Sequence, residues 1–179
     1  TYTRGELYIA DRGNHRIRAY TASSVTTVTT SILSPIGITT DDINLYVTDL
    51  HDIHKIVIST GVVSDIAGDS TPGSSDGIGA SAGFYNPSGI AYINGHLYVA
   101  DTDNHAIRDI EISSKTVSLF AGSMSEVGTA NGIGTAARFN SPYGICSDGT
   151  YLYVTDKINN NIRKVNIATK EVTKLAGAN

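Results

Sequence analysis

Cysteine, basic charge and long apolar runs are all scarce in this sequence. Its single cysteine, Cys146, excludes a disulfide scaffold within the chain. With 13 basic against 17 acidic residues, the formal net charge is -4, which argues against a nucleic-acid module that binds through a broad basic face. No stretch approaches the roughly 20 consecutive apolar residues of a membrane-spanning helix, so no membrane span is predicted. Helical periodicity is missing from every long window, which leaves an all-β chain.

The chain instead repeats itself. A phrase of the form Leu-Tyr-(Val/Ile)-(Ala/Thr)-Asp occurs four times, and its aspartates are 38, 52 and 55 residues apart. A Pro-x-Gly-Ile phrase precedes the last three copies, an alternating run follows each aspartate, and a short Thr- and Ser-rich run closes each unit. Each phrase has the composition and turn boundaries of a strand. Four antiparallel strands repeated at this spacing predict the blades of a β-propeller.

The strand count depends on the first unit. Only six residues precede Leu7, so this unit has no Pro-x-Gly-Ile strand. The sequence therefore predicts four blades, the first without its inner strand, and fifteen strands in all. Helical turns are expected only within 80–84 and 135–139. We expect these four blades to be part of a larger propeller, although a closed four-bladed ring is conceivable. The predicted repeat units are 1–34, 35–86, 87–141 and 142–179.

The segment Asp101–Arg108 resembles the NHL repeat family, which is named for an Asn-His-Leu signature, and Asp11–Arg18 matches it as well. The Gly-rich connections 76–84 and 131–139 are also typical of that family, and their last residues, Phe84 and Phe139, are expected to fill the space between blades. The resemblance implies a propeller that usually closes with about six blades. It also implies a loop-rich face that binds proteins, RNA or small ligands.

Two units depart from the family pattern. In the fourth, Asn160-Asn161 stands where Asn-His is expected. The second has lost two residues, so that His51 and His54 are not expected to be the family histidine. We expect His15 and His105 to be structural, with hydrogen bonds in the turn between the second and third strands.

An arginine recurs at one position of the third strand, and His54 takes this position in the second unit. Its recurrence predicts a structural pair between blades with an aspartate such as Asp11, Asp101 or Asp156, and an anion-binding ring is the open alternative. The three arginines are Arg18, Arg108 and Arg163.

Binding is expected at one end of the propeller, because the second-to-third strand loops and the inter-blade connections of an up-and-down blade lie on the same face. Loop-rich faces of this kind are where repeat proteins usually bind. The candidate contact residues are the non-repeating ones in these loops: Arg12, Arg16, His51, Asp52, Asp103, Lys157 and Asn159.

These observations favour a noncatalytic binding or scaffolding propeller, with a sensor ectodomain or an extracellular or periplasmic protein as the preferred setting. The partner is then a protein or a small ligand on the loop-rich face, with self-association through open blade edges as a further expectation. No catalytic residue and no cofactor is assigned, but calcium bound by carbonyls of the central channel stays open. The alternatives are a metal-dependent lyase- or lactonase-like enzyme with its site at that channel and, disfavoured by the acidic charge, RNA binding.

Overall fold

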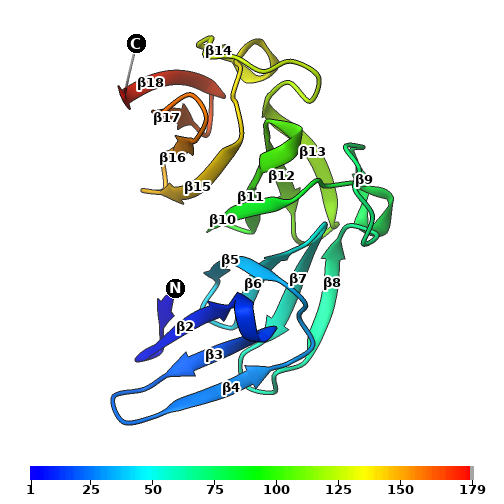
Figure 1. The fold of residues 1–179 in the computed structure, drawn as a ribbon, viewed down its shortest axis with the longest axis vertical. Helices are drawn as coiled ribbons and strands as arrows, with labels where there is room; N and C mark the ends of the chain where they lie inside the picture. Colours follow the sequence, from blue (N-terminus) through cyan, green and yellow to red (C-terminus); the bar gives the residue numbers. More distant parts are fainter. Residues whose placement is uncertain (178–179) are drawn as a thin grey trace.

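The computed structural model describes residues 1–177, which form four antiparallel sheets arranged as an open arc of propeller blades (Figure 1). Blade 1 contains β1 (Tyr2–Thr3), β2 (Glu6–Asp11), β3 (Arg16–Tyr20) and β4 (Val25–Thr29). Blade 2 contains β5 (Pro35–Thr40), β6 (Asn44–Asp49), β7 (Asp52–Val57) and β8 (Val63–Ala67). Blade 3 contains β10 (Pro87–Ile93), β11 (His96–Asp101), β12 (Ala106–Glu111), β13 (Thr116–Gly122) and the added β9 (Gly77–Ile78). Blade 4 contains β15 (Pro142–Ser147), β16 (Tyr151–Asp156), β17 (Asn161–Asn166), β18 (Glu171–Gly177) and the added β14 (Gly132–Ile133).

Helix is confined to four 3-10 turns within the described residues. They are η1 (Arg12–Asn14), η2 (Gly79–Ser81), η3 (Thr102–Asn104) and η4 (Gly134–Ala136). Two of them lie at or beside the expected helical turns, and η1 and η3 were not expected. In residues 1–177 there is no helix with the length and hydropathy needed to cross a membrane.

The all-β class and the four blades are confirmed, but fifteen strands is too low a count. Three two-residue strands, β1, β9 and β14, bring the described total to eighteen. In blade 1, β1 takes the place of the six- or seven-residue inner strand of the other blades. It pairs with β2 because Arg4 and Gly5, with φ of 53° and 78°, form a tight hairpin turn. The other two strands come from the Gly-rich connections and cover the outer edges of β13 and β18.

Each hydrophobic cluster lies between two blades, not within one. Successive strand residues point to opposite faces, so the Leu-Tyr-Val phrase supplies both faces of its blade. We call the side bearing the tyrosine the forward face and the side bearing the leucine and valine the back face. The forward face of blade 3, with Tyr98, Ile107 and Phe120, packs on the back face of blade 4. That back face consists of Leu152, Val154, Val165 and Val172.

The same contact joins blade 1 to blade 2 and blade 2 to blade 3. A residue from the connection fills each junction. Phe84 and Phe139 do so at the two junctions with Gly-rich connections, as expected from the sequence, and Ile32 does so at the short first connection. All three side chains are at most 1% exposed.

Around the axis, the inner strands β5, β10 and β15 lie side by side (Figure 1). Glycine is required in their Pro-x-Gly-Ile phrase because neighbouring backbones come close. A Cβ on Gly37 would lie 2.1 Å from the carbonyl oxygen of Ser88, and one on Gly89 would lie 2.5 Å from that of Tyr143. Gly144, in the terminal blade, would meet only the Thr155 side chain, at 3.2 Å.

This difference gives a matched pair of substitutions. We expect Gly89→Ala to lower the free energy of unfolding by about 1–3 kcal/mol, because the new methyl group forces two backbones apart. Gly144→Ala should cost less than about 1 kcal/mol, since a side chain can move aside. Urea unfolding of the two variants measures both values. Equal losses would show that the approach of the inner strands is not the reason for the glycine.

Candidate binding sites on the propeller

A buried arginine ties each Gly-rich connection to its blade. We call residues 68–86 and 122–141 the inserts. Arg108, with a fully buried side chain, donates to Asp101 Oδ2 at 3.0 Å within its own blade. It also donates to the insert, at 2.7 Å to Asp76 Oδ1, and its guanidinium lies 5.2 Å from the ring centre of Phe84. The insert is therefore held over the outer part of blade 3.

Blade 4 repeats this arrangement. Arg163 donates to Asp156 Oδ2 at 3.1 Å and to Asn131 Oδ1 at 3.0 Å, and it lies 5.1 Å from the ring centre of Phe139. The aspartate partners were predicted correctly, but the prediction of a pair between blades was wrong, because both members belong to one blade. The anion-binding ring is also wrong, since the side chains of Arg108 and Arg163 are fully buried in these pairs.

At the rim, the end of the blades formed by the second-to-third strand loops and the inserts, an asparagine holds each insert. Asn104 donates to Gly73 O at 2.7 Å, and Asn159 donates to Gly128 O at the same distance. Asn159 therefore occupies the family asparagine position, and Asn160, with φ of 53°, matches the left-handed His105, with φ of 55°. The predicted alignment at Asn160-Asn161 was wrong by one residue, because the repeat is defined by this hydrogen bond.

Histidines join consecutive blades at the same end. His105 Nδ1 accepts the Ser141 N–H at 3.1 Å, just before the first strand of blade 4. His51 accepts the Asn86 N–H at 3.3 Å in the equivalent place before blade 3, and His15 bonds the Leu33 carbonyl. Contrary to the sequence interpretation, His51 does the work of the family histidine. Like His15 and His105, it stands directly before the third-strand residue that pairs with the blade's aspartate. The bonds of all three reach the connection to the next blade, not only their own turn.

The structure places the candidate contact residues at the rim, but several of them already make hydrogen bonds or ring contacts within the chain. Asn159 is a structural residue, and Asp52 accepts both the N–H and the hydroxyl of Ser70, each at 2.7 Å. His51 also lies edge-on to Tyr85, with ring centres 5.7 Å apart. Arg16 is half-buried and bonds the Asn14 carbonyl.

Three candidates are exposed on three different blades. Arg12 donates to the Ser34 hydroxyl at 2.9 Å, and Asp103 accepts from the Asn86 amide at 2.6 Å. The Lys157 ammonium lies 5.1 Å from the ring centre of Tyr143. These side chains stand on loops that the asparagine and histidine bonds fix in place, so they present mixed charge on a rigid surface.

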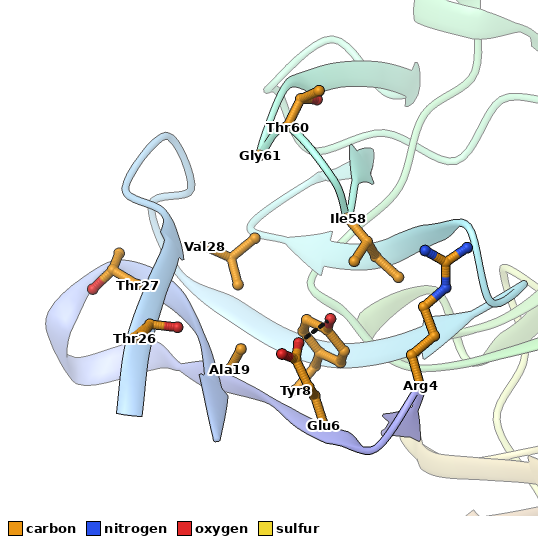
Figure 2. Close-up of a pocket in the computed structure, with 10 residues that line it drawn as sticks. All are labelled: Arg4, Glu6, Tyr8, Ala19, Thr26, Thr27, Val28, Ile58, Thr60 and Gly61. Atoms are coloured by element: carbon orange, nitrogen blue, oxygen red, sulfur yellow. Dashed lines mark hydrogen bonds between the residues drawn. The ribbon is translucent and has the colours of Figure 1, made fainter. Parts of the chain in front are cut away.

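A cleft of about 450 Å³ lies at the opposite end, between blade 1 and the β7–β8 hairpin of blade 2 (Figure 2). The Tyr8 hydroxyl donates to Glu6 Oε2 at 2.5 Å at its centre. Burial of the phenol is the larger cause and the hydrogen bond to Glu6 is the second, and together they raise the pKa of Tyr8 to about 12. The phenol therefore stays protonated. The cleft is lined by Arg4, Glu6, Tyr8, Ala19, Thr26, Thr27, Val28, Ile58, Thr60 and Gly61.

This lining combines one carboxylate, one guanidinium and several hydroxyls, which suits a small polar ligand bound by hydrogen bonds and charge. The cleft is not predicted from the sequence, because no strand is expected before Leu7. The available sign was Arg4-Gly5, a pair that can form a two-residue hairpin turn ahead of the Leu-Tyr phrase. The expected central channel is lined at this part of the arc by β5, β10 and β15, mainly with isoleucine, glycine and backbone. Across residues 1–177, no three His, Cys, Asp or Glu side chains are grouped so that they could hold a metal ion.

The family model for the NHL repeat matches residues 84–108. NHL repeat-containing protein 2 of Bos taurus is 37% identical over 94 residues, which cover 51% of this chain and 13% of that protein. The Homo sapiens protein of the same name is 33% identical over 107 residues, which cover 58% and 15%. The chain contains an NHL repeat. It spans only 13–15% of the length of these relatives.

Solved structures share the fold of the NHL-repeat chain. An auxiliary nutrient binding protein from Bacteroides thetaiotaomicron superposes with a TM-score of 0.75 and 23% identity, over 94% of this chain and 45% of that one. A streptogramin B lyase superposes with a TM-score of 0.68 and 17% identity, over 99% and 53%. At these identities the likeness shows the fold alone, and the NHL-repeat chain spans about half of each neighbour.

The Arg–Asp pairs differ in burial, so we expect them to contribute differently to the free energy of unfolding. Arg108→Leu should cost about 3–5 kcal/mol of unfolding free energy, because Asp101 would stay buried without its cation. Arg18, whose side chain is 33% exposed, makes its pair with Asp11 in a setting open to solvent. Arg18→Leu should therefore cost at most about 1 kcal/mol. Urea denaturation measures both, and similar losses would contradict the assigned role of the insert.

His54 takes the arginine position in blade 2, whose connection has no Gly-rich insert. Its Nδ1 lies 2.9 Å from Asp65 Oδ1 and its Nε2 lies 3.5 Å from Asp49 Oδ2. Burial lowers the pKa of His54, but the hydrogen bonds and charges of both aspartates outweigh burial and raise it above the ordinary value. When protonated, the imidazole can pair with both aspartates in place of the guanidinium.

This shift predicts a pH dependence of stability. A raised folded-state pKa means that His54 contributes fully below about pH 6.5, the ordinary histidine value, and that its contribution is lost as the pH rises through the folded-state pKa. The unfolding free energy of the wild type minus that of His54→Gln should therefore fall between mildly acidic and mildly alkaline pH. Taking the difference between the two proteins removes every contribution that they share. A difference that stays constant or grows with pH would refute the assignment.

Proposed function

We propose that this NHL-repeat chain is a noncatalytic binding module that holds a protein or a small ligand on its rim. The observation that carries the proposal is the separation of two kinds of rim residue. The repeating ones, such as Asn104 and His105, bond the inserts and connections. The non-repeating Arg12, Asp103 and Lys157 are exposed above them.

Such an arrangement favours binding because the rim needs little further ordering. Loops held by internal hydrogen bonds lose less conformational entropy when a partner docks. The exposed side chains carry both signs of charge, which suits a partner that also carries both signs. A polyanion such as RNA is disfavoured, since the net charge is -4 and Asp103 would face its phosphates.

The similar folds include a nutrient binding protein and a lyase, so the architecture is compatible with binding and with catalysis. A metal-dependent enzyme with its site at the central channel is the alternative. Metal analysis of the purified protein distinguishes the two, because that alternative requires a retained metal. The same measurement tests the proposal of calcium held by channel carbonyls.

A charge-swapped pair on the rim tests the binding proposal. We expect Asp103→Lys with Lys157→Glu to reduce recovery of the bound partner, captured from an extract of the producing cells, by about tenfold or more, as loss of central contacts does. The matched control, Glu111→Lys with Lys170→Glu, makes the same swap at the opposite end and should leave recovery unchanged. Mass spectrometry quantifies the captured partner for each protein.

Three results would contradict the proposal. They are equal recovery by the two double variants, a salt-sensitive gel shift with single-stranded RNA, and one retained transition-metal ion per chain.

A further inference from the structure

The cleft in Figure 2 lies where the forward face of blade 1 carries one short side chain. In every blade the tyrosine of the Leu-Tyr phrase has a cross-strand partner on the third strand. In blade 1 this partner is Ala19, whereas in the other blades it is Lys55, Asp109 or Lys164. Those three longer side chains are half-buried. Ala19 therefore leaves open, beside Tyr8, the space that a charged side chain takes elsewhere.

The β7–β8 hairpin of blade 2 forms the opposite wall. At its tip, Gly61 has a φ of 69°, and a Cβ on it would lie 2.5 Å from the carbonyl oxygen of Val28. Glycine thus allows the hairpin to approach the backbone of β4 closely. Together the two blades enclose an apolar floor of Ala19, Val28 and Ile58.

This cleft belongs to a junction inside the chain. It lies between the forward face of blade 1 and the back face of blade 2, which pack on each other. β2 runs from Glu6 at the cleft to Asp11 at the rim, and β1 lies antiparallel to it, with Tyr2 opposite Leu7. The chain therefore enters β1 from the rim side, away from the cleft.

Two opposite charges stand in the cleft without pairing with each other. Within residues 1–177 the Arg4 guanidinium has no hydrogen bond or ion pair, and the Glu6 carboxylate accepts only the Tyr8 hydroxyl, at Oε2. The side chain of Tyr8 lies between the other two (Figure 2). Besides burial, which is the largest cause, Glu6 raises the pKa of Tyr8 and Arg4 lowers it. Both charges thus act at the centre of the cleft.

These charges select among ligand classes. A cation would be repelled by Arg4, and an anion, phosphate included, would be repelled by Glu6. A neutral ligand such as a sugar would leave both groups without an opposite charge. A zwitterion satisfies both at once, because each of its charged ends makes a charge-assisted hydrogen bond.

We propose that this cleft binds a zwitterionic small molecule, an α-amino acid with an apolar side chain. Its carboxylate pairs with Arg4, its ammonium pairs with Oε1 of Glu6, and its side chain packs on Ala19, Val28 and Ile58. The cleft volume of about 450 Å³ lies in the usual range for small-molecule sites. The site is at the opposite end of the blades from the rim, so the proposal does not depend on the function proposed there.

Titration of isotope-labelled protein with L-valine, isobutylamine and isovalerate, followed by NMR chemical shifts, tests the ligand class. All three probes share a branched apolar group, but isobutylamine lacks the carboxylate and isovalerate lacks the ammonium. Valine should bind with a dissociation constant of about 1 mM or lower, and it should shift the amide signals of 4–8, 26–28 and 58–61. Each analogue should bind about tenfold more weakly or worse. No valine binding, equal binding of all three probes, or shifts confined to other residues would overturn the proposal.

Two isosteric substitutions test the charges separately. Arg4→Gln should weaken valine binding about tenfold or more, but isobutylamine should bind at least as tightly as it does to the wild type, because a repelling charge is gone. Glu6→Gln should weaken valine binding to a similar extent and spare isovalerate, and its amide oxygen can still accept the Tyr8 hydroxyl. Valine affinity unchanged in either variant would contradict the pairing.

Filling the cleft tests the site itself. Ala19→Lys introduces the residue that blades 2 and 4 carry at this position, so it should abolish valine binding while circular dichroism and the urea midpoint stay close to the wild type. Ala19→Leu fills the same space without a charge and should also abolish binding, which covers the case of an unfolded lysine variant. Ala168→Lys, at an exposed hairpin residue of blade 4, is the matched control and should bind valine normally. A folded Ala19 variant that still binds valine like the wild type would overturn the proposal.

Discussion

The structure depends on the packing of one blade's forward face against the next blade's back face. No blade has a hydrophobic cluster of its own, because strand alternation sends the tyrosine of the Leu-Tyr-Val phrase one way and the leucine and valine the other. Stability is then a sum over junctions between neighbours, as in other repeat proteins. The arc has three such junctions among its described residues.

The buried arginines add a polar constraint to this apolar one. A guanidinium can satisfy an aspartate and several insert oxygens at once because its donors form a rigid fork. Where the insert is present, Arg108 and Arg163 are fully buried. The connection before blade 2 has no insert, and this blade uses His54 between two aspartates, whereas Arg18 of blade 1 is partly exposed. Which basic side chain occupies this position of the third strand therefore depends on the length of the connection before that blade.

These constraints separate scaffold from candidate function. Most polar rim residues that repeat serve the scaffold, and so does Asn159, which the sequence suggested as a contact residue. The side chains that remain exposed on the rim do not repeat, and each belongs to a different blade. The cleft at the opposite end exists only because β1 folds back on β2 and places Arg4 and Glu6 beside Tyr8. The described residues thus present one polar surface at the rim and another at the opposite end of the blades.

The sequence by itself determined the fold class, the four blades and the identity of the Arg–Asp pairs, because repetition of whole phrases reports the repeating environment directly. It also placed the plugging phenylalanines, whose spacing from the inserts is regular. It could not decide which blade an aspartate serves, that His51 keeps the histidine position despite the shortened turn, or that two residues before Arg4 form a strand. Those outcomes depend on which backbone groups come within hydrogen-bonding distance, and only the tertiary structure brings them together.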